Sequence, residues 1–288
     1  MEPLSILEPI IFTANTANSE APGDYTKDGL LFCGRCNTPK QSRQCFMGHN
    51  ITVGCLCRCA TEARDRESAT RKKQEEADRI MRLRSSGVPD QEFRNARFSS
   101  DDGQSPGPMG VLKRYAEQWD EMFHQKQGLL LWGGVGTGKS FGAACIANEL
   151  IERSIPVCMI NLSRILNDLT NFQSVDRNQY IADLMKYPLL ILDDFGMERK
   201  TEFANEQVFN VIDERYRSGK PLVVTTNIPL ASLRNPDSLE KSRIYDRLLG
   251  MCVPIGFGDN SRRRAKAAIK MRQTAELLKR EDRNGNEN

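Results

Sequence analysis

Long apolar runs are absent from this chain of 288 residues. The longest, at residues 128–132, 187–192 and 221–224, fall well below the ~20 residues that a helix needs to cross a bilayer. Residues 1–14 hold acidic side chains and no basic one, whereas a secretory signal begins with positive charge. We therefore expect a cytoplasmic protein that does not enter a membrane.

A large excess of one charge is also missing. The net charge is only +3, which is too small to indicate nucleic-acid binding by itself. The clearest local excess is at residues 262–283, with nine Lys and Arg against three Asp and Glu. On charge alone, we interpret that stretch as a solvated helical tail.

From residue 111 onward, short apolar runs alternate with segments of helical periodicity. The runs are apolar throughout, which is typical of strands covered on both faces. This order predicts an α/β fold, a parallel sheet sandwiched between two layers of helices. Strands are expected at 128–132, 156–162, 188–192 and 221–226, and helices at 111–127, 139–153, 163–170, 179–186 and 205–218.

The segment after the first of these strands matches the phosphate-binding pattern G-x-x-x-x-G-K-[ST] in full. Its glycines let backbone N–H groups point at phosphate oxygens, and the start of the next helix adds a favourable dipole. We expect Lys139 to neutralise the β and γ phosphates and Ser140 to bind magnesium. The sequence thus predicts a P-loop NTPase that binds ATP and Mg²⁺ through Gly133, Gly134, Val135, Gly136, Thr137, Gly138, Lys139 and Ser140.

Polar side chains end two further predicted strands. Asp193 and Asp194 follow the apolar run 189–192, at the edge where open α/β sheets bind ligands. We expect Asp193 to hold magnesium, through water, and Asp194 to orient or deprotonate the attacking water. Asn227 ends the next strand, where its amide either senses the γ phosphate and holds the attacking water or only turns the chain before Pro229.

Taken in order, the segments GGVGTGKS, LLILDDFG, VVTTN and SRIYDRL resemble the AAA+ ATPases of bacterial helicase loaders. DnaC and DnaI are members of that family, and the IstB transposition ATPases are close kin. The resemblance covers roughly residues 87–270. It implies an ATPase that associates with itself through the ATP site and loads a hexameric replicative DNA helicase onto single-stranded DNA during DNA replication.

The resemblance also implies roles for arginines. Arg243 matches the arginine finger that reaches the ATP site of a neighbouring subunit. Arg247, one turn later, is the competing candidate, and its alternative role is a salt bridge on its own helix. Arg262, which ends the segment 258–262, matches a late motif of the family and is expected to sense nucleotide in its own subunit. The aromatic residue usual in that motif is absent here.

Six of the nine cysteines lie between Cys33 and Cys59, which in a cytosolic chain favours a metal site over disulfides. Zinc takes four ligands, and so small a segment could hardly fold without the metal. The resemblance to the zinc modules of DnaI-like and phage-type loaders favours Cys33, Cys36, Cys57 and Cys59, with Cys55 as the main rival. The full set of candidates is Cys33, Cys36, Cys45, His49, Cys55, Cys57 and Cys59.

These observations divide the chain into a flexible N-terminus (1–32), a zinc-binding module (33–60), a charged helix with a linker (61–110), the AAA+ domain (111–270) and a polar tail (271–288). Two other functions stay open. One is an IstB-like transposition helper, against which the zinc module argues. The other is an adaptor that binds ATP with little hydrolysis, which the pair of Asp residues permits. A cysteine-rich N-terminus on a minimal core favours a phage or prophage origin.

Overall fold

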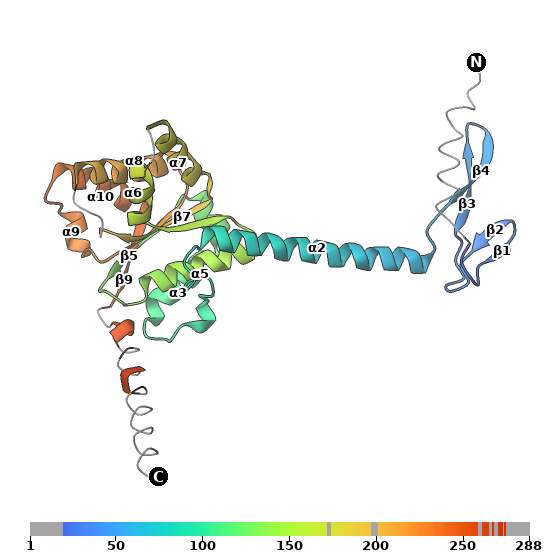
Figure 1. Cartoon of the computed structure of the whole chain (residues 1–288), viewed down its shortest axis with the longest axis horizontal. Coiled ribbons are helices and arrows are strands. Elements are labelled where there is room, and N and C mark those ends of the chain that lie inside the picture. The colour runs from blue at the N-terminus through green and yellow to red at the C-terminus, as the bar shows by residue number, and fades with distance from the viewer. Residues whose placement is uncertain are drawn as a thin grey trace, which may run out of the picture. The chain divides into compact units, whose positions relative to one another are not determined.

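The computed structural model describes residues 20–171, 174–196, 201–258, 261–264, 267, 270–272 and 274. The chain divides into two compact units, Met1–Ala77 and Asp78–Asn288 (Figure 1). Within the described ranges, no helix combines the length and the apolar character that crossing a bilayer requires.

The second unit is built on a five-stranded sheet in which every pairing is parallel. The spatial order is β6-β7-β8-β5-β9, and helices cover both faces (Figure 1). This arrangement confirms the predicted α/β class. The strands are β5 (Gly128–Gly133), β6 (Val157–Asn161), β7 (Leu189–Phe195), β8 (Leu222–Thr226) and β9 (Cys252–Phe257).

Alternate residues of the strands enter two separate cores. In β5, Leu129 and Leu131 pack in one core with α3 and α5, while Leu130 packs in the other with α6, α7, α8 and α10. Because both faces are covered, the strands show no polar alternation. The helices of this unit are α3 (Pro106–Glu117), α4 (Trp119–His124), α5 (Lys139–Glu152), α6 (Leu162–Asn171), α7 (Ser174–Lys186), α8 (Glu202–Ser218), α9 (Leu230–Arg234) and α10 (Leu239–Met251).

Some predicted bounds between residues 99 and 127 were wrong. The linker expected up to Gly110 contains the 3-10 turn η1 (Phe98–Ser100) and the beginning of α3. Pro106 takes the first helical position, where the N–H that it lacks would have no partner in the helix. The helix expected at 111–127 is two helices, α3 and α4, which meet at Gln118.

Strand β9 was not predicted. Pro254 and Gly256 interrupt its apolar pattern and argue against a central strand. The structure resolves this conflict, because β9 is an edge strand that pairs only with β5 and an edge tolerates both residues.

The first unit holds two antiparallel hairpins, β1 (Tyr25–Lys27) with β2 (Leu30–Phe32) and β3 (Gln41–Phe46) with β4 (His49–Gly54). The β1–β2 hairpin lies within the segment expected to be flexible; residues 1–19 of that segment are outside the described residues. Asp28 and Gly29 have φ values of 51° and 72°, the turn geometry of a two-residue hairpin loop.

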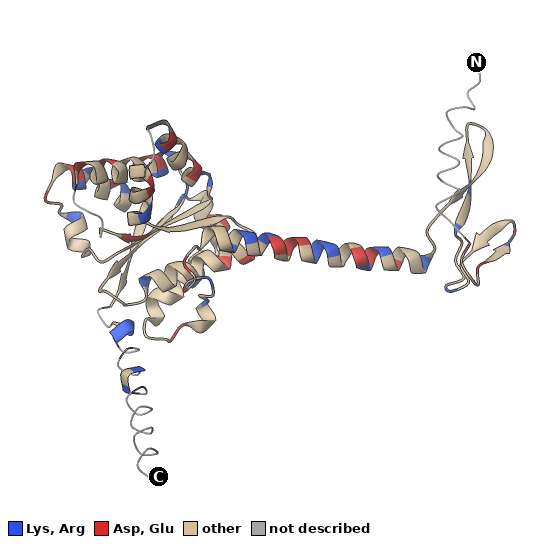
Figure 2. Ribbon diagram, in the orientation of Figure 1, with Lys and Arg blue, Asp and Glu red and all other residues tan. Residues whose placement is uncertain are grey.

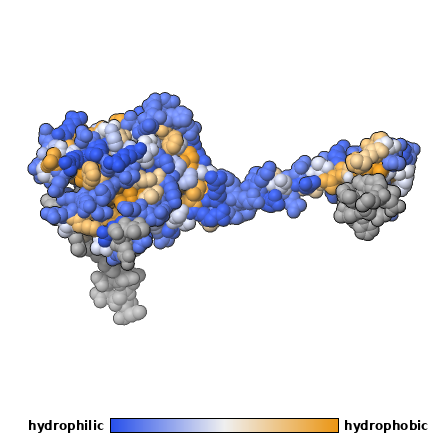
Figure 3. All heavy atoms as spheres, turned by 90° about the horizontal axis from the view of Figure 1, so that it is seen from above, coloured by the Kyte–Doolittle hydropathy of each residue, from blue (hydrophilic) through white to orange (hydrophobic). Residues whose placement is uncertain are grey.

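Helix α2 (Arg58–Gly87) corresponds to the charged helix predicted at the start of the segment 61–110. Basic and acidic residues follow one another along it (Figure 2), and its visible surface in Figure 3 is hydrophilic. Gly87 is its only buried residue. The polar surface agrees with the predicted charged helix, which begins three residues earlier than the segment 61–110.

Candidate functional site

The predicted phosphate loop connects β5 to α5 and borders a pocket of about 320 Å³. Gly133, Gly136 and Gly138 have φ values of 144°, 78° and 100°, a region that glycine enters without steric cost. The volume is at the lower end of the 300–1,000 Å³ that is typical of ligand pockets. The loop thus has the backbone geometry and the space that a phosphate group requires.

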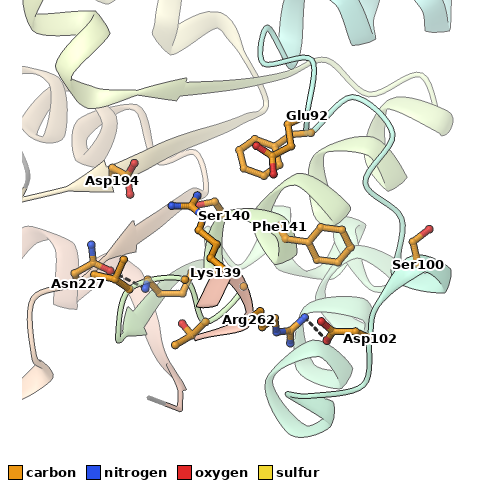
Figure 4. Close-up of a pocket in the computed structure, with 15 residues that line it drawn as sticks. Glu92, Ser100, Asp102, Lys139, Ser140, Phe141, Asp194, Asn227 and Arg262 are labelled. Atoms are coloured by element: carbon orange, nitrogen blue, oxygen red, sulfur yellow. Dashed lines mark hydrogen bonds and ion pairs between the residues drawn. The ribbon is translucent and has the colours of Figure 1, made fainter. Parts of the chain in front are cut away.

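Lys139, the first residue of α5, lies inside the loop. Its Nζ donates to the carbonyl oxygens of Gly133 at 3.0 Å and Gly134 at 2.6 Å, and to Oδ1 of Asn227 at 2.8 Å. Burial lowers the pKa of this ammonium, and the carboxylates of Asp194 and Asp193 oppose that effect. The structure therefore brings Asn227, predicted from the end of β8, directly onto the lysine of the phosphate loop (Figure 4).

Asp193 and Asp194 lie near the end of β7 in different environments. Oδ1 of Asp193 accepts a hydrogen bond from Thr225 at 2.6 Å. Burial raises the pKa of Asp193, whereas hydrogen bonds from Thr225 and Ser140 lower it. The contact with Ser140 brings together the two side chains predicted to bind magnesium, and their oxygens are the donors that Mg²⁺ prefers.

Asp194 lines the pocket, and its backbone is unusual. Its φ is 57°, and the register of β7 on β8 shifts between Leu192 and Phe195. Such a bulge turns side chains out of their normal alternation. Here, it lets consecutive residues of one strand both reach the site.

Asn161, at the end of β6, is a site residue that the sequence analysis missed. Its Nδ2 donates to Oδ2 of Asp194 at 3.3 Å, and its Oδ1 accepts from the backbone N–H of Ser163 at 2.8 Å. Asn161 therefore caps α6, which begins one residue before the helix predicted at 163–170. A signal was present, since a polar residue ending a parallel strand next to β7 must lie beside the Asp pair.

The wall of the pocket opposite Asp194 comes from the segment between α2 and α3 (Figure 4). It includes Glu92, Phe93, Ser100 and Asp102. This segment had been predicted only as a linker. It is fixed to α5 because Nδ2 of Asn148 donates to the carbonyl oxygens of Phe93 at 2.8 Å and of Ala96 at 3.1 Å.

Arg262 lies at the pocket, as the resemblance had implied. Its backbone N–H donates to the carbonyl of Gly136 at 2.8 Å, and its guanidinium pairs with Asp101 and Asp102. Residues 259 and 260 of the expected late motif are outside the described residues.

Arg243 and Arg247 differ sharply, although both lie on α10. Arg247 donates from Nε to Oδ1 of Asp213 at 2.5 Å and lies 4.7 Å above the ring of Phe209, both on α8. Its ion pair is thus with α8, not with its own helix. Arg243 is exposed, and no ion pair involves its side chain in the part of the chain that the structure describes. Of these two arginines, Arg243 is the one whose side chain is exposed and outside any ion pair among the described residues.

In the first unit, one candidate metal centre stands out among the described residues. One sulfur from each of Cys33, Cys36, Cys57 and Cys59 lies within 4.8 Å of the others. The Sγ atoms of Cys33 and Cys59 are 3.6 Å apart, and those of Cys57 and Cys59 are 3.4 Å apart. Four sulfurs at about 2.3 Å from one zinc ion would be about 3.8 Å apart. The group fits zinc, and it leaves out Cys45, His49 and Cys55.

The surroundings of Cys33 and Cys36 favour the thiolate form, whereas those of Cys59 favour the protonated thiol. Backbone N–H groups of Cys36 and Arg35 lower the pKa of Cys33, and a hydrogen bond from Thr38 contributes most to lowering that of Cys36, to about 5. Hydrogen bonding to Cys57, Cys36 and Cys33 raises the pKa of Cys59 to about 12. Four thiolates this close are stable together only around a positive ion.

Known proteins and one family model are similar to a large part of this chain. A family model described as IstB-like ATP binding protein matches residues 65–269. The replicative helicase loader DnaI of Bacillus subtilis is 24% identical over 211 residues, 68% of this chain and 68% of DnaI. The replicative helicase loader DnaC of Escherichia coli K12 is 25% identical over 173 residues, 59% of this chain and 69% of DnaC.

A more local match is an ATP-binding protein in an insertion sequence of Mycobacterium tuberculosis. It is 34% identical over 103 residues, which are 35% of this chain and 41% of that protein. Among solved structures, the crystal structure of DnaI has a TM-score of 0.52 at 24% identity, covering 63% of this chain and 99% of that one. This likeness confirms the predicted P-loop AAA+ fold.

Proposed function

We propose that this chain, which belongs to the IstB-like ATP-binding protein family, is an ATP-dependent loader that places a hexameric replicative DNA helicase on single-stranded DNA. The observation that carries the proposal is the similarity to DnaI and DnaC, two replicative helicase loaders, each over more than half of this chain. Single-stranded DNA would be bound by basic residues of the second unit, through non-specific and salt-sensitive contacts.

The proposed ATP site uses the residues that the sheet edge brings together. Lys139 binds the β and γ phosphates, while Ser140 and Asp193 hold Mg²⁺, which neutralises phosphate charge when bound. Asp194 orients the attacking water and Asn227 contacts the γ phosphate. Arg262 contacts nucleotide within the subunit, and Arg243 contacts the nucleotide of a neighbouring subunit. We also propose that these residues together hydrolyse ATP.

The first unit is proposed to bind one zinc ion through Cys33, Cys36, Cys57 and Cys59, and to contact the helicase. The close approach of the four sulfurs supports the metal. Contact with the helicase rests on the resemblance to other loaders with a zinc module.

Capture of the replicative helicase by the immobilised full-length chain tests the main proposal. We expect ATP to increase capture of the helicase by the wild type. The Lys139→Ala variant should show no increase with ATP and no ATPase activity. Lys113→Ala, which changes an exposed lysine on α3, is the matched control. If the chain captured no helicase under any nucleotide condition, the loading function would be ruled out. If the Lys139→Ala variant still hydrolysed ATP, hydrolysis at the proposed phosphate loop would be ruled out.

A transposition helper ATPase is the alternative, and the similarity to the insertion-sequence protein favours it. Such a protein would act on target duplex DNA without the replicative helicase. ATPase activity stimulated by duplex DNA, together with failure to capture the helicase, would support this function over loading.

A further inference from the structure

Arg262 is hydrogen-bonded at one end only. Its Nη1 lies 2.8 Å from Oδ1 of Asp101 and 2.8 Å from Oδ1 of Asp102. Its Nε and Nη2 are buried, and neither has a hydrogen-bond partner among the described residues. In the guanidinium, Nη1 therefore contacts two carboxylates, while the donors on the opposite edge, Nε and Nη2, make no hydrogen bond among the described residues.

That free edge belongs to a side chain packed against the phosphate loop. A Cβ on Gly138 would approach Nε and Cζ of Arg262 to 2.9 Å. Arg262 also lines the same pocket as Lys139 and Ser140. Nε and Nη2 of an arginine form a fork that matches two oxygens of a phosphate.

The acidic residues are themselves held in place. The backbone N–H of Gly103 donates to Oδ2 of Asp101 at 3.3 Å, and that of Gln104 donates to Oδ1 of Asp102 at 3.2 Å. The side chain of Asp101 is 13% exposed and that of Asp102 is 28% exposed. Because both carboxylates contact Nη1, neither occupies the edge formed by Nε and Nη2.

We propose that Asp101 and Asp102 are positioning residues, which orient Arg262 so that its Nε–Nη2 edge binds the terminal phosphate of ATP. The inference rests on the proposed binding of ATP at the phosphate loop. It gives the segment between α2 and α3 a part in distinguishing ATP from ADP, since only ATP carries the phosphate that the fork would bind.

Nucleotide affinities of a variant series test this proposal. Titration calorimetry gives the Kd of ADP and of a slowly hydrolysed ATP analogue for the wild type, Asp101→Asn/Asp102→Asn, Arg262→Gln and the triple variant. We expect the ratio of the ADP Kd to the analogue Kd to fall about tenfold in the Asp variant and in Arg262→Gln, the effect of losing one charge-assisted hydrogen bond. The triple variant should fall no further than Arg262→Gln.

Asp120→Asn is the matched control, because Asp120 is exposed and pairs with Arg153 outside the pocket. Its ratio should equal that of the wild type. Thermal unfolding without nucleotide checks that each variant folds, and the single changes Asp101→Asn and Asp102→Asn replace the double variant if it does not.

An Asp variant whose ratio is unchanged or increased would overturn the positioning role, and so would a triple variant with an additive loss. If instead the wild type bound neither nucleotide, the proposed ATP site itself would fail. The two failures are therefore distinguishable in one series.

Discussion

At the scale of single residues, Asp193 is a group whose charge opposes folding. Burial raises its pKa, so the ionised carboxylate is less favourable in the folded chain than in the unfolded one. We expect Asp193→Asn to raise the free energy of unfolding, measured by urea without nucleotide at pH 7. Asn keeps an oxygen that accepts from Thr225. The same change should abolish magnesium-dependent nucleotide binding.

The pH dependence of this difference follows from the direction of the shift. A raised pKa contributes stability below the unfolded-state value, and this contribution is lost as pH rises through the folded-state value. The advantage of Asp193→Asn over the wild type should therefore shrink as pH is lowered from 7 toward 4. An Asn variant less stable than the wild type at pH 7 would contradict the argument.

Arg215 on α8 has a structural role with a large expected energy. It is fully buried, and its guanidinium donates to the carbonyl oxygens of Pro221, Tyr187 and Pro188, which lie just before β7 and β8. Burial lowers its pKa only to about 10, so it stays charged at pH 7. We expect Arg215→Lys to lower the free energy of unfolding by about 3 kcal/mol, since buried carbonyls lose their donors.

Urea unfolding of Arg215→Lys is compared with Arg217→Lys from the same helix. Arg217 is exposed and pairs with Asp213 at 2.9 Å, and such surface pairs contribute about 1 kcal/mol at most. Equal losses in the two variants would show that the buried contacts are not what stabilises this region.

At the scale of elements, α10 carries two arginines with different proposed roles: Arg243 acts on a neighbouring subunit, and Arg247 stabilises the fold. Arg243→Ala should lower ATPase activity at least about 100-fold without changing the melting temperature, because its side chain is proposed to act on another subunit. Arg247→Ala should lower the melting temperature, because it loses Asp213 and the ring of Phe209. Adding Lys139→Ala chains, which retain Arg243, should restore part of the activity of Arg243→Ala. No restoration in such mixtures would argue against action in trans.

Strands were predicted where a continuous apolar run was enough to specify them. That was so for β5 to β8, each covered on both faces. The hairpins of the first unit were not predicted, because their strands are not continuous apolar runs. Their sequence signal lies in turn residues such as the Asp28-Gly29 pair. The bulge at Asp194 could not be predicted, because it depends on how β7 meets β8.

The candidate site was predictable as far as its residues belong to recognisable motifs. Lys139, Asp194 and Asn227 follow strands whose parallel order brings their ends to one edge. The wall that contains Phe93 and Asp102 was not predicted, because local sequence carries no sign of which distant segment covers a pocket.

At the scale of the whole molecule, the division into two compact units predicts that loss of the metal does not change the affinity for nucleotide. Cys33→Ser should release about one zinc ion per chain and weaken capture of the helicase. The Kd for ATP should stay within about twofold of the wild type. Cys45→Ser is the control, because Cys45 is exposed and outside the four-sulfur group. A Cys33→Ser chain that kept its zinc would refute the proposed ligand set.

The position of β5 in the sheet has a consequence for synthesis of the chain. The strand that carries the phosphate loop pairs on one side with β8 and on the other with β9, the last strand of the sheet. A ribosome therefore completes the nucleotide-binding motif long before it supplies either neighbour. Nascent chains released before Cys252 would hold the whole motif with an open β5 edge, and an unpaired edge is a site of aggregation. Messages cut short between the codons for Ser140 and Cys252 would thus yield aggregating fragments, not a smaller working ATPase.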